Sequence, residues 1–138
     1  MKAILDHIGI AVASLDEALV FYRDALGLEI EGTEDVPSQG VRVSFVGVGK
    51  ASLELLESTD EDSPIARFIG RHGPGLHHIT LRVRDLDVAL TELKAQGICL
   101  IDDAPRSGAE GALVAFIHPS STHGVLVELK QWGGAGDD

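Results

Sequence analysis

Hydrophobic residues near the start of the chain alternate with small or polar ones, a pattern typical of a strand buried on one face. Residues 4–12 present one apolar face and one small face that carries a histidine: Ile8, Ile10 and Val12 against His7, Gly9 and Ala11. We expect the apolar face to pack on helices and the histidine face to line a cavity.

From Ser14 onward the spacing of apolar residues changes to that of a helix. Ser14 is a good N-cap, and Glu17 follows three positions later, as in a capping box. Gly27 stands where a helix commonly ends in glycine. The sequence therefore predicts a helix between Ser14 and Gly27, with an apolar stripe of Leu15, Leu19, Tyr22 and Leu26.

Three strands complete this first unit, whose order is β-α-β-β-β. Apolar runs and turn residues predict strands at 28–31, 41–48 and 51–56, a loop at 33–40 and a hairpin turn at 49–50. A short helix is expected at 64–71, ending before Gly73-Pro74-Gly75.

The same pattern occurs a second time along the chain. His78 repeats His7 at an offset of 71 positions (78 − 7), and the offset also relates 15–19 to 86–90 and 43–46 to 114–117. A spacing kept over three separated segments indicates a duplication. The second copy is predicted as strand 76–83, helix 85–96, strand 98–102, loop 103–111, strand 112–117, turn 118–124 and strand 125–130.

One such unit leaves a face of its sheet bare, whereas two can enclose a cavity. We therefore expect an α+β fold in which two paired βαβββ modules form a curved mixed sheet around that cavity. The prediction is a single domain over 1–138, with modules at 4–57 and 76–131, a linker at 58–75 and a flexible tail at 132–138.

The composition fits a globular protein that folds without disulfides. The chain has 138 residues, 44% of them hydrophobic, and one cysteine, Cys99, which we expect in the core. It has neither an apolar run long enough to span a membrane nor a signal-peptide pattern, so we expect a cytoplasmic protein without a membrane partner. The formal charge of −11 argues against a nucleic-acid partner.

The alternation also places one glutamate of each unit on the histidine face. Glu54 and Glu128 each lie between two apolar residues of a predicted strand, so they face away from the core. The histidine-to-glutamate spacings are 47 (54 − 7) and 50 (128 − 78). The neighbours expected in the core are Leu53, Leu55, Val125, Val127 and Leu129.

Two imidazoles and two carboxylates that converge in a cavity are suited to a divalent metal ion. The predicted ligands are His7, Glu54, His78 and Glu128. Nitrogen and oxygen donors without a thiolate favour Co, Mn, Ni, Zn or Fe in a catalytic site, and magnesium is disfavoured. A lone histidine or a glutamate between leucines is usually an ordinary strand residue, but its repetition in both units favours the metal site.

The remaining histidines are assigned no part in this site. His77 has the opposite parity and is interpreted as structural, whereas His72, His118 and His123 fall in predicted loops and are expected to be solvated. The glycines of 108–111 are either a flexible loop or a place where the backbone approaches a ligand.

These features resemble the vicinal oxygen chelate superfamily, which includes glyoxalase I, extradiol dioxygenases and bleomycin-resistance proteins. Within it, residues 4–131 are most similar to the methylmalonyl-CoA epimerase family. The similarity is carried by residues 6–11, 36–43, 53–56, 73–79 (Gly-Pro-Gly-Leu-His-His-Ile), 118–119 (His-Pro) and 124–129 (Gly-Val-Leu-Val-Glu-Leu).

The resemblance implies paired βαβββ modules, commonly in a homodimer, and the same four metal ligands. It also implies an acyl-CoA thioester substrate, methylmalonyl-CoA, whose R and S forms would be interconverted through loss of the C2 proton and an enolate chelated to the metal. Glu128 and Glu54 are the candidate catalytic carboxylates.

One position departs from that pattern. Some relatives carry a glutamate where this chain has Val43, which cannot transfer a proton. Either Glu54 substitutes for it, or another group or water does, or the substrate differs. The basic residues Arg67, Arg71 and Lys50 could meet the CoA phosphates or could be ordinary surface charges.

Two other functions compete with this one. A glyoxalase I would use a similar metal site on a glutathione hemithioacetal. A non-catalytic ligand-binding protein, like the bleomycin-resistance proteins, would rely on an apolar or aromatic cavity. The full ligand set and an aromatic content of 4% count against the second alternative.

Overall fold

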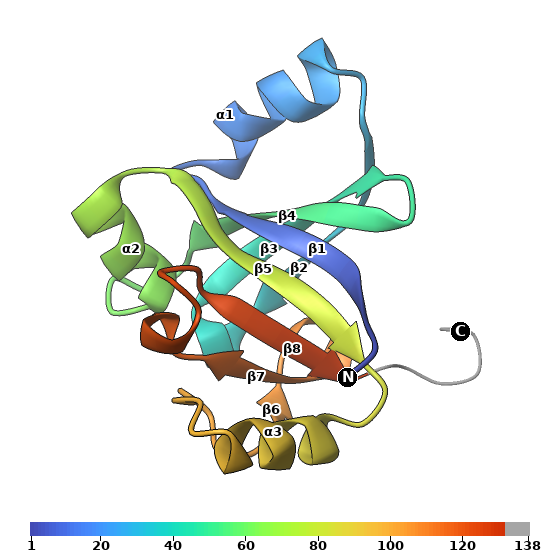
Figure 1. Cartoon of the computed structure of the whole chain (residues 1–138). Coiled ribbons are helices and arrows are strands. Elements are labelled where there is room, and N and C mark those ends of the chain that lie inside the picture. The colour runs from blue at the N-terminus through green and yellow to red at the C-terminus, as the bar shows by residue number, and fades with distance from the viewer. Residues whose placement is uncertain (132–138) are drawn as a thin grey trace. The chain divides into compact units, whose positions relative to one another are not determined.

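The computed structural model describes residues 1–131 (Figure 1). The chain divides into two compact units, one formed by His7–His77 and the other by Met1–Asp6 together with the chain from His78 onward. Strand β1 (Ala3–Ala11) crosses the boundary between them. The tail predicted at 132–138 lies outside the described residues.

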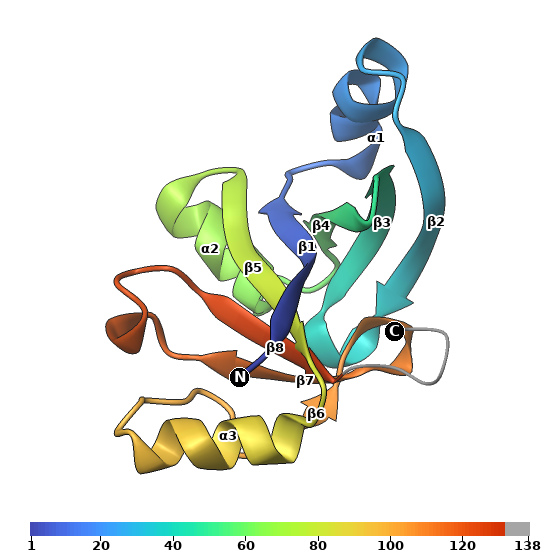
Figure 2. The ribbon, with the colours of Figure 1, turned by 45° about the vertical axis from the view of Figure 1, so that its right-hand side comes forward.

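The unit His7–His77 contains a mixed sheet in the order β2-β3-β4-β1. β1 and β4 are parallel, whereas β3 is antiparallel to both of its neighbours; Figure 2 shows β2 and β3 side by side. After β1 the elements are α1 (Leu15–Leu19), the π-helical turn η1 (Val20–Ala25), β2 (Glu29–Val36), the 3-10 turn η2 (Pro37–Gln39), β3 (Val41–Val48), β4 (Ala51–Ser58) and α2 (Pro64–His72).

The core of this unit lies between the sheet and α1. Ser14 caps the helix as expected, because its Oγ accepts a hydrogen bond from the Glu17 N–H at 3.3 Å. The core contains Val12, Leu15, Val46 and Leu55, with Ile10, Ala18, Leu19, Tyr22, Leu28, Ile30 and Leu53 packed against it. The predicted apolar faces of 4–12 and 51–56 therefore do pack on the helix.

Leu26 does not join the predicted helical stripe and is 53% exposed. The helix widens into a π turn over Val20–Ala25, where the Leu26 N–H donates to the Phe21 carbonyl five residues earlier. The extra residue in the turn rotates Leu26 away from the core. Leu28 packs on the core in its place.

Strand β2 is longer than the sequence predicts. It continues to Val36, into the segment predicted as a loop, and its register with β3 shifts between Ile30 and Gly32. The shift is a β-bulge, in which one strand carries an extra residue, here Glu31. Residues on either side of the bulge therefore break the simple alternation.

The other unit repeats the arrangement, with a mixed sheet in the order β5-β8-β7-β6. β5 and β8 are parallel and the other pairs are antiparallel. Its elements are β5 (Gly75–Val83), α3 (Leu86–Ala95), β6 (Arg106–Ser107), η3 (Ala109–Gly111), β7 (Leu113–Ile117), η4 (Pro119–Ser121) and β8 (Val127–Gln131).

The core of this unit lies between its sheet and α3 (Figure 1). The buried residues are Val83, Leu86, Ala89, Leu90, Ala115, Ile117 and Leu129. With one β-α-β-β-β module in each unit, the predicted α+β class and glyoxalase-like fold are confirmed.

Three details of the second unit differ from prediction. The strand expected at 98–102 is reduced to a single bridge from Leu100 to Ile117, and the two-residue β6 forms inside the predicted loop. Val125, expected in the core, precedes β8 and is 45% exposed. Cys99 is also exposed, because the missing strand leaves it in an irregular segment at the surface.

Within residues 1–131, no helix combines the length and the apolar character needed to cross a bilayer.

Candidate functional site

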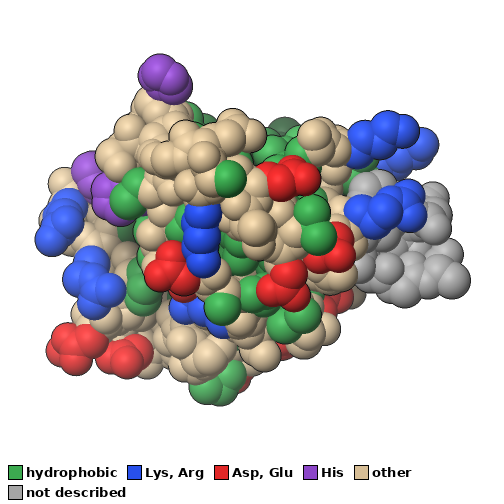
Figure 3. Space-filling model, turned by 60° about the horizontal axis from the view of Figure 1, so that its bottom comes forward, with side chains coloured by type: hydrophobic (Ala, Val, Ile, Leu, Met, Phe, Trp, Pro, Cys, Tyr) green, Lys and Arg blue, Asp and Glu red, His purple; other side chains and the backbone are tan. Residues whose placement is uncertain are grey.

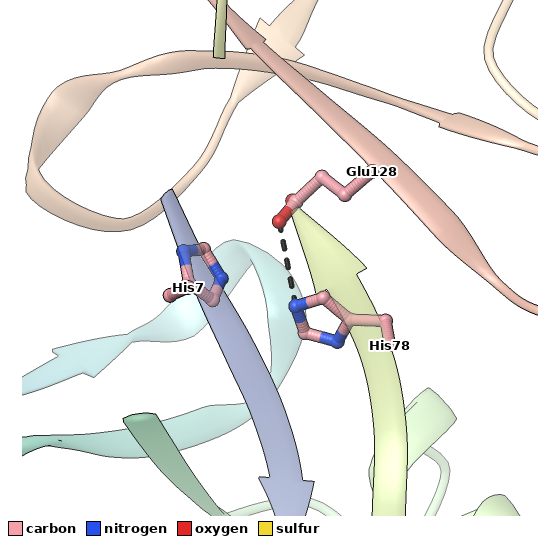
Figure 4. A group of neighbouring side chains, drawn as sticks. All are labelled: His7, His78 and Glu128. Carbon is pink, nitrogen blue, oxygen red and sulfur yellow. Dashed lines mark ion pairs between the residues drawn. The ribbon is translucent and has the colours of Figure 1, made fainter. Parts of the chain in front are cut away.

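His7 and Glu54 meet on one face of the sheet of the unit His7–His77. His7 lies on β1 (Figure 4), and its Nδ1 is 2.8 Å from Oε2 of Glu54 on β4. The two strands are parallel with Gly9 opposite Glu54, which places a residue two positions before Gly9 on the same face. Both side chains are buried. The predicted pairing within this unit is therefore present.

His78 and Glu128 meet in the same way in the other unit. The Nε2 atom of His78 on β5 is 3.4 Å from Oε1 of Glu128 on β8, an ion pair drawn in Figure 4. Both residues are buried, and the core residues Val127 and Leu129 on either side of Glu128 point to the α3 side. Each unit thus holds one buried imidazole against one buried carboxylate.

Thr80 fixes the orientation of the Glu128 carboxylate. It lies directly opposite Glu128 in the β5–β8 register, and its hydroxyl donates a 2.5 Å hydrogen bond to Oε1 of Glu128. Thr80 is fully buried, so water does not compete for this bond. The position matching Thr80 at the repeat offset is Gly9, which cannot make this contact with Glu54.

A phenylalanine stands directly across the strand pair from each glutamate. Phe45 pairs with Glu54 and Phe116 with Glu128. The Phe116 ring lies edge-on to the His78 ring at 5.8 Å, and the guanidinium of Arg106 lies 5.3 Å from the same ring. These rings give each ligand pair an apolar flank, which lowers the local polarity and strengthens electrostatic interactions.

A charged cluster occupies the end of the Glu128 face. Asp6 forms an ion pair with Arg82, whose Nε is 3.0 Å away, and another with Lys130, whose Nζ is 3.4 Å away, and all three side chains are largely shielded from solvent. Arg82 and Lys130 lie opposite each other, two residues beyond Thr80 and Glu128 and on the same face. The positive charges of Arg82 and Lys130 balance the negative charge of the Asp6 carboxylate, so we assign this cluster a structural role.

The donor set of both units fits a divalent metal ion. Imidazole nitrogens and carboxylate oxygens are the ligands preferred by catalytic first-row divalent metals. His7 with Glu54, and His78 with Glu128, offer these atoms from buried positions. The hydroxyl of Thr80 supplies the kind of supporting hydrogen bond that holds a ligating carboxylate in place.

The other histidines stand apart from these pairs. His77 lies edge-on to Phe68, with ring centroids 5.0 Å apart, and His72, which lies at the end of α2 rather than in a loop, has its ring tilted against that of Phe68. His118 accepts a hydrogen bond from the Ser120 N–H and caps η4, and His123 is exposed. These contacts account for their positions without a ligand.

The structure gives one of the loop glycines a packing role. A Cβ atom on Gly108 would lie 3.0 Å from the Val114 side chain, so a larger residue would require that side chain to shift by a few tenths of an ångström. The basic residues considered for CoA phosphates, Lys50, Arg67 and Arg71, are all exposed. Arg67 donates to the Asp62 carbonyl.

Sequence reasoning missed Thr80, although the signal was available. Thr80 has the parity of His78, two positions along the same strand, and therefore had to face the same side. The ion pairs of Asp6 could not be predicted from strand parity, because its partners, Arg82 and Lys130, are more than 70 positions away in the sequence.

Comparison with known proteins identifies relatives over nearly the whole chain. The family model described as "Glyoxalase/Bleomycin resistance protein/Dioxygenase superfamily" matches residues 6–116. An ethylmalonyl-CoA/methylmalonyl-CoA epimerase of Cereibacter sphaeroides is 40% identical over 129 residues, covering 92% of this chain and 96% of that protein. The mitochondrial methylmalonyl-CoA epimerase of Bos taurus is 40% identical over 128 residues, covering 92% and 73%.

A solved structure agrees with these relatives. It is a methylmalonyl-CoA epimerase in complex with methylmalonyl-CoA and NH4+, 35% identical to this chain. The TM-score is 0.93, and the match covers 100% of this chain and 99% of the other.

Proposed function

The chain belongs to the glyoxalase/bleomycin resistance protein/dioxygenase superfamily and, within it, to the methylmalonyl-CoA epimerase family, and from this membership we propose that it interconverts (R)- and (S)-methylmalonyl-CoA. The substrate is then an acyl-CoA thioester, and the reaction removes and returns the proton at C2.

The observation that carries this proposal is the buried histidine–glutamate pair in each unit. The C2 proton lies between a carboxylate and a thioester and is only weakly acidic in water. Its removal needs a carboxylate held in a shielded site and stabilisation of the negative charge that develops on the substrate. The two pairs supply buried carboxylates and the donors for a stabilising cation.

We propose that His7, Glu54, His78 and Glu128 together hold one divalent ion, of Co, Mn, Ni, Zn or Fe rather than Mg. When bound, such an ion acts as a Lewis acid on the oxygens of the substrate. Glu128 is the candidate for one proton transfer at C2, and Glu54 is a candidate for assisting it. Thr80 orients Glu128 through its short hydrogen bond.

The proposal extends to the setting of the reaction. We expect a cytoplasmic homodimer without a nucleic-acid or membrane partner. Several apolar side chains of the first helical segment remain exposed in the single chain, among them Val20, Phe21 and Leu26. Burial of apolar surface of this kind favours association, and light scattering on purified protein would measure the oligomeric state.

The test of this function is exchange of the C2 proton of methylmalonyl-CoA in deuterated water, followed by NMR. Metal-loaded protein should exchange the proton and interconvert the two epimers, and protein stripped of metal should not. Glu128→Gln removes a proton-transfer group without changing the volume of the side chain, so the rate should fall by about 100-fold or more.

Glu92→Gln is the matched control, because Glu92 is exposed on α3 and should exchange at the wild-type rate. If the C2 proton does not exchange with any of the five metals, the proposal is refuted. Conversion of methylglyoxal and glutathione by the same preparation would then assign the protein to the glyoxalase I reaction.

A further inference from the structure

Inversion at C2 requires proton transfer on both faces of that carbon. One group removes the proton from one face, and a second group must deliver a proton to the opposite face. Val43, in the middle of β3, is 1% exposed and carries no group that could do so. The group that acts opposite Glu128 must therefore be a residue other than Val43.

Glu34 is the residue directly opposite Val43. The β2–β3 register pairs Glu34 with Val43 and, two residues further along, Val36 with Val41. Directly opposite residues of an antiparallel pair lie on the same face of the sheet, with Cβ atoms about 5 Å apart. Glu34 is partly buried, whereas its neighbours Thr33 and Asp35 are exposed.

That face is also the face of His7 and Glu54. On the other side of β3, Val43 pairs with Leu56 and Phe45 with Glu54, so Val43 and Glu54 share a face. The opposite side of β2 and β3 carries the exposed ion pair of Asp35 and Arg42, at 2.7 Å. The hydrogen bond from Arg42 holds the pKa of Asp35 below its usual value, so this neighbour is an ionised surface carboxylate.

The β-bulge at Glu31 is what turns Glu34 inward. Before the bulge, Ile30 pairs with Val46 and packs on the helix-side core. By simple alternation Glu34, four positions later, would face the helix as well. The extra residue reverses the alternation, so Gly32 and Glu34 fall on the His7 and Glu54 face instead. Bulges often serve to re-aim a side chain next to a functional site.

We propose that Glu34 is the second acid–base group of the C2 epimerisation, in the role that Val43 cannot fill; this inference rests on the proposed function. In one direction the Glu34 carboxylate takes the C2 proton, and the electron pair of the broken C–H bond delocalises into the thioester carbonyl. A proton from the acid form of Glu128, the candidate for the other proton transfer, then forms the new C–H bond on the opposite face. In the reverse direction the two groups exchange roles, and both regain their starting state by proton exchange with water.

Backbone spacing is compatible with this assignment. Glu34 and Glu54 lie on strands separated by one intervening strand, and Glu34 is level with Leu56, two residues from Glu54, so their backbones are roughly 12 Å apart. A single strand, β3, therefore separates Glu34 from the strand pair that carries His7 and Glu54.

The test uses metal-loaded wild-type protein and the Glu34→Gln variant, each incubated separately with the R and the S epimer in deuterated water. Wild-type protein should exchange both epimers and interconvert them. Glu34→Gln should lose interconversion by about 100-fold or more, while one epimer still exchanges its C2 proton without inversion. Glu34→Asp keeps a carboxylate and should retain a measurable rate of inversion.

Glu29→Gln is the matched control, because Glu29 lies on the same strand, before the bulge, and is exposed. If Glu34→Gln interconverts the epimers at the rate of this control, the inference about Glu34 is overturned and the proposed function stands. Loss of exchange for both epimers, with thermal stability and metal content unchanged, would also overturn it, since a group acting on one face does not stop exchange on the other. An inactive wild-type protein would instead refute the proposed function, and this inference with it.

Discussion

Thr80 illustrates how a single residue distinguishes two units that are otherwise alike. Both units carry a buried histidine against a glutamate, but only Glu128 accepts a hydrogen bond from a buried hydroxyl directly across the strand. At the matching position of the other unit, Gly9 leaves Glu54 without this support. We infer that Glu128 is held more rigidly and is the better candidate for a defined proton transfer.

Replacing Thr80 with valine keeps the side-chain shape and removes only the hydroxyl. Loss of a buried hydrogen bond to a charged acceptor should lower the free energy of unfolding by about 2 kcal/mol, as measured by urea denaturation. Metal affinity should fall by about 10- to 100-fold, because the carboxylate loses the group that orients it. Thr80→Ser keeps the hydroxyl and should retain most of the affinity; equal losses in both variants would contradict this role.

At the scale of the element, each helix is held by the face it turns to its own sheet. In α3, Leu86, Ala89 and Leu90 are buried against β7 and β8, and Val88 points to solvent. Asp85 caps the helix, since its carboxylate accepts a hydrogen bond from the Val88 N–H at 3.1 Å. The amphipathic pattern and the cap together define both the position and the rotation of the helix.

Truncation of Leu90 to alanine should therefore be strongly destabilising. The side chain is 2% exposed, so its removal loses buried apolar contact and leaves a cavity, at a cost of about 3 kcal/mol in the free energy of unfolding. Val88→Ala on the same helix is the control, because Val88 is 50% exposed and should change stability by less than about 0.5 kcal/mol. Comparable losses in the two variants would show that α3 does not pack through this face.

Strand β2 shows where pattern analysis fails for an element. Its first part follows the helix-side alternation through Ile30, and the bulge then changes the face on which later residues lie. Bulges depend on pairing with the neighbouring strand, so one strand read alone cannot reveal them. The same limit explains Leu26, because the π turn that displaces it adds a residue to a helix whose sequence fits a regular period.

At the scale of the whole molecule, the net charge bears on the metal ion proposed above. The chain carries a formal charge of −11. On the face drawn in Figure 3, acidic and basic side chains are interspersed with apolar ones, and the described residues there form no continuous basic surface. An anionic acyl-CoA thus gains no general electrostatic attraction, and a bound divalent cation would supply a local one.

Removal of metal should consequently affect stability as well as activity. A ligand that binds only the folded state stabilises it by about 2.7 kcal/mol at 100 times its dissociation constant. Treatment with EDTA should lower the melting temperature by roughly 5–10 °C, and added Co or Mn should restore it. His7→Ala should abolish the metal-dependent shift, whereas His123→Ala, at an exposed position, should not. A melting temperature independent of metal in the wild type would refute a metal site of this affinity.

The sequence by itself determined the duplicated β-α-β-β-β order and the cap at Ser14. It also determined that one histidine and one glutamate share a sheet face in each unit. These follow from local periodicity and from a repeat, which are properties of the chain taken in order. Tertiary structure alone decided the hydrogen bond of Thr80 to Glu128, the ion pairs of Asp6, and the face on which Glu34 lies. These depend on strand register and on contacts between distant segments, and a one-residue change in register moves a side chain to the opposite face of the sheet.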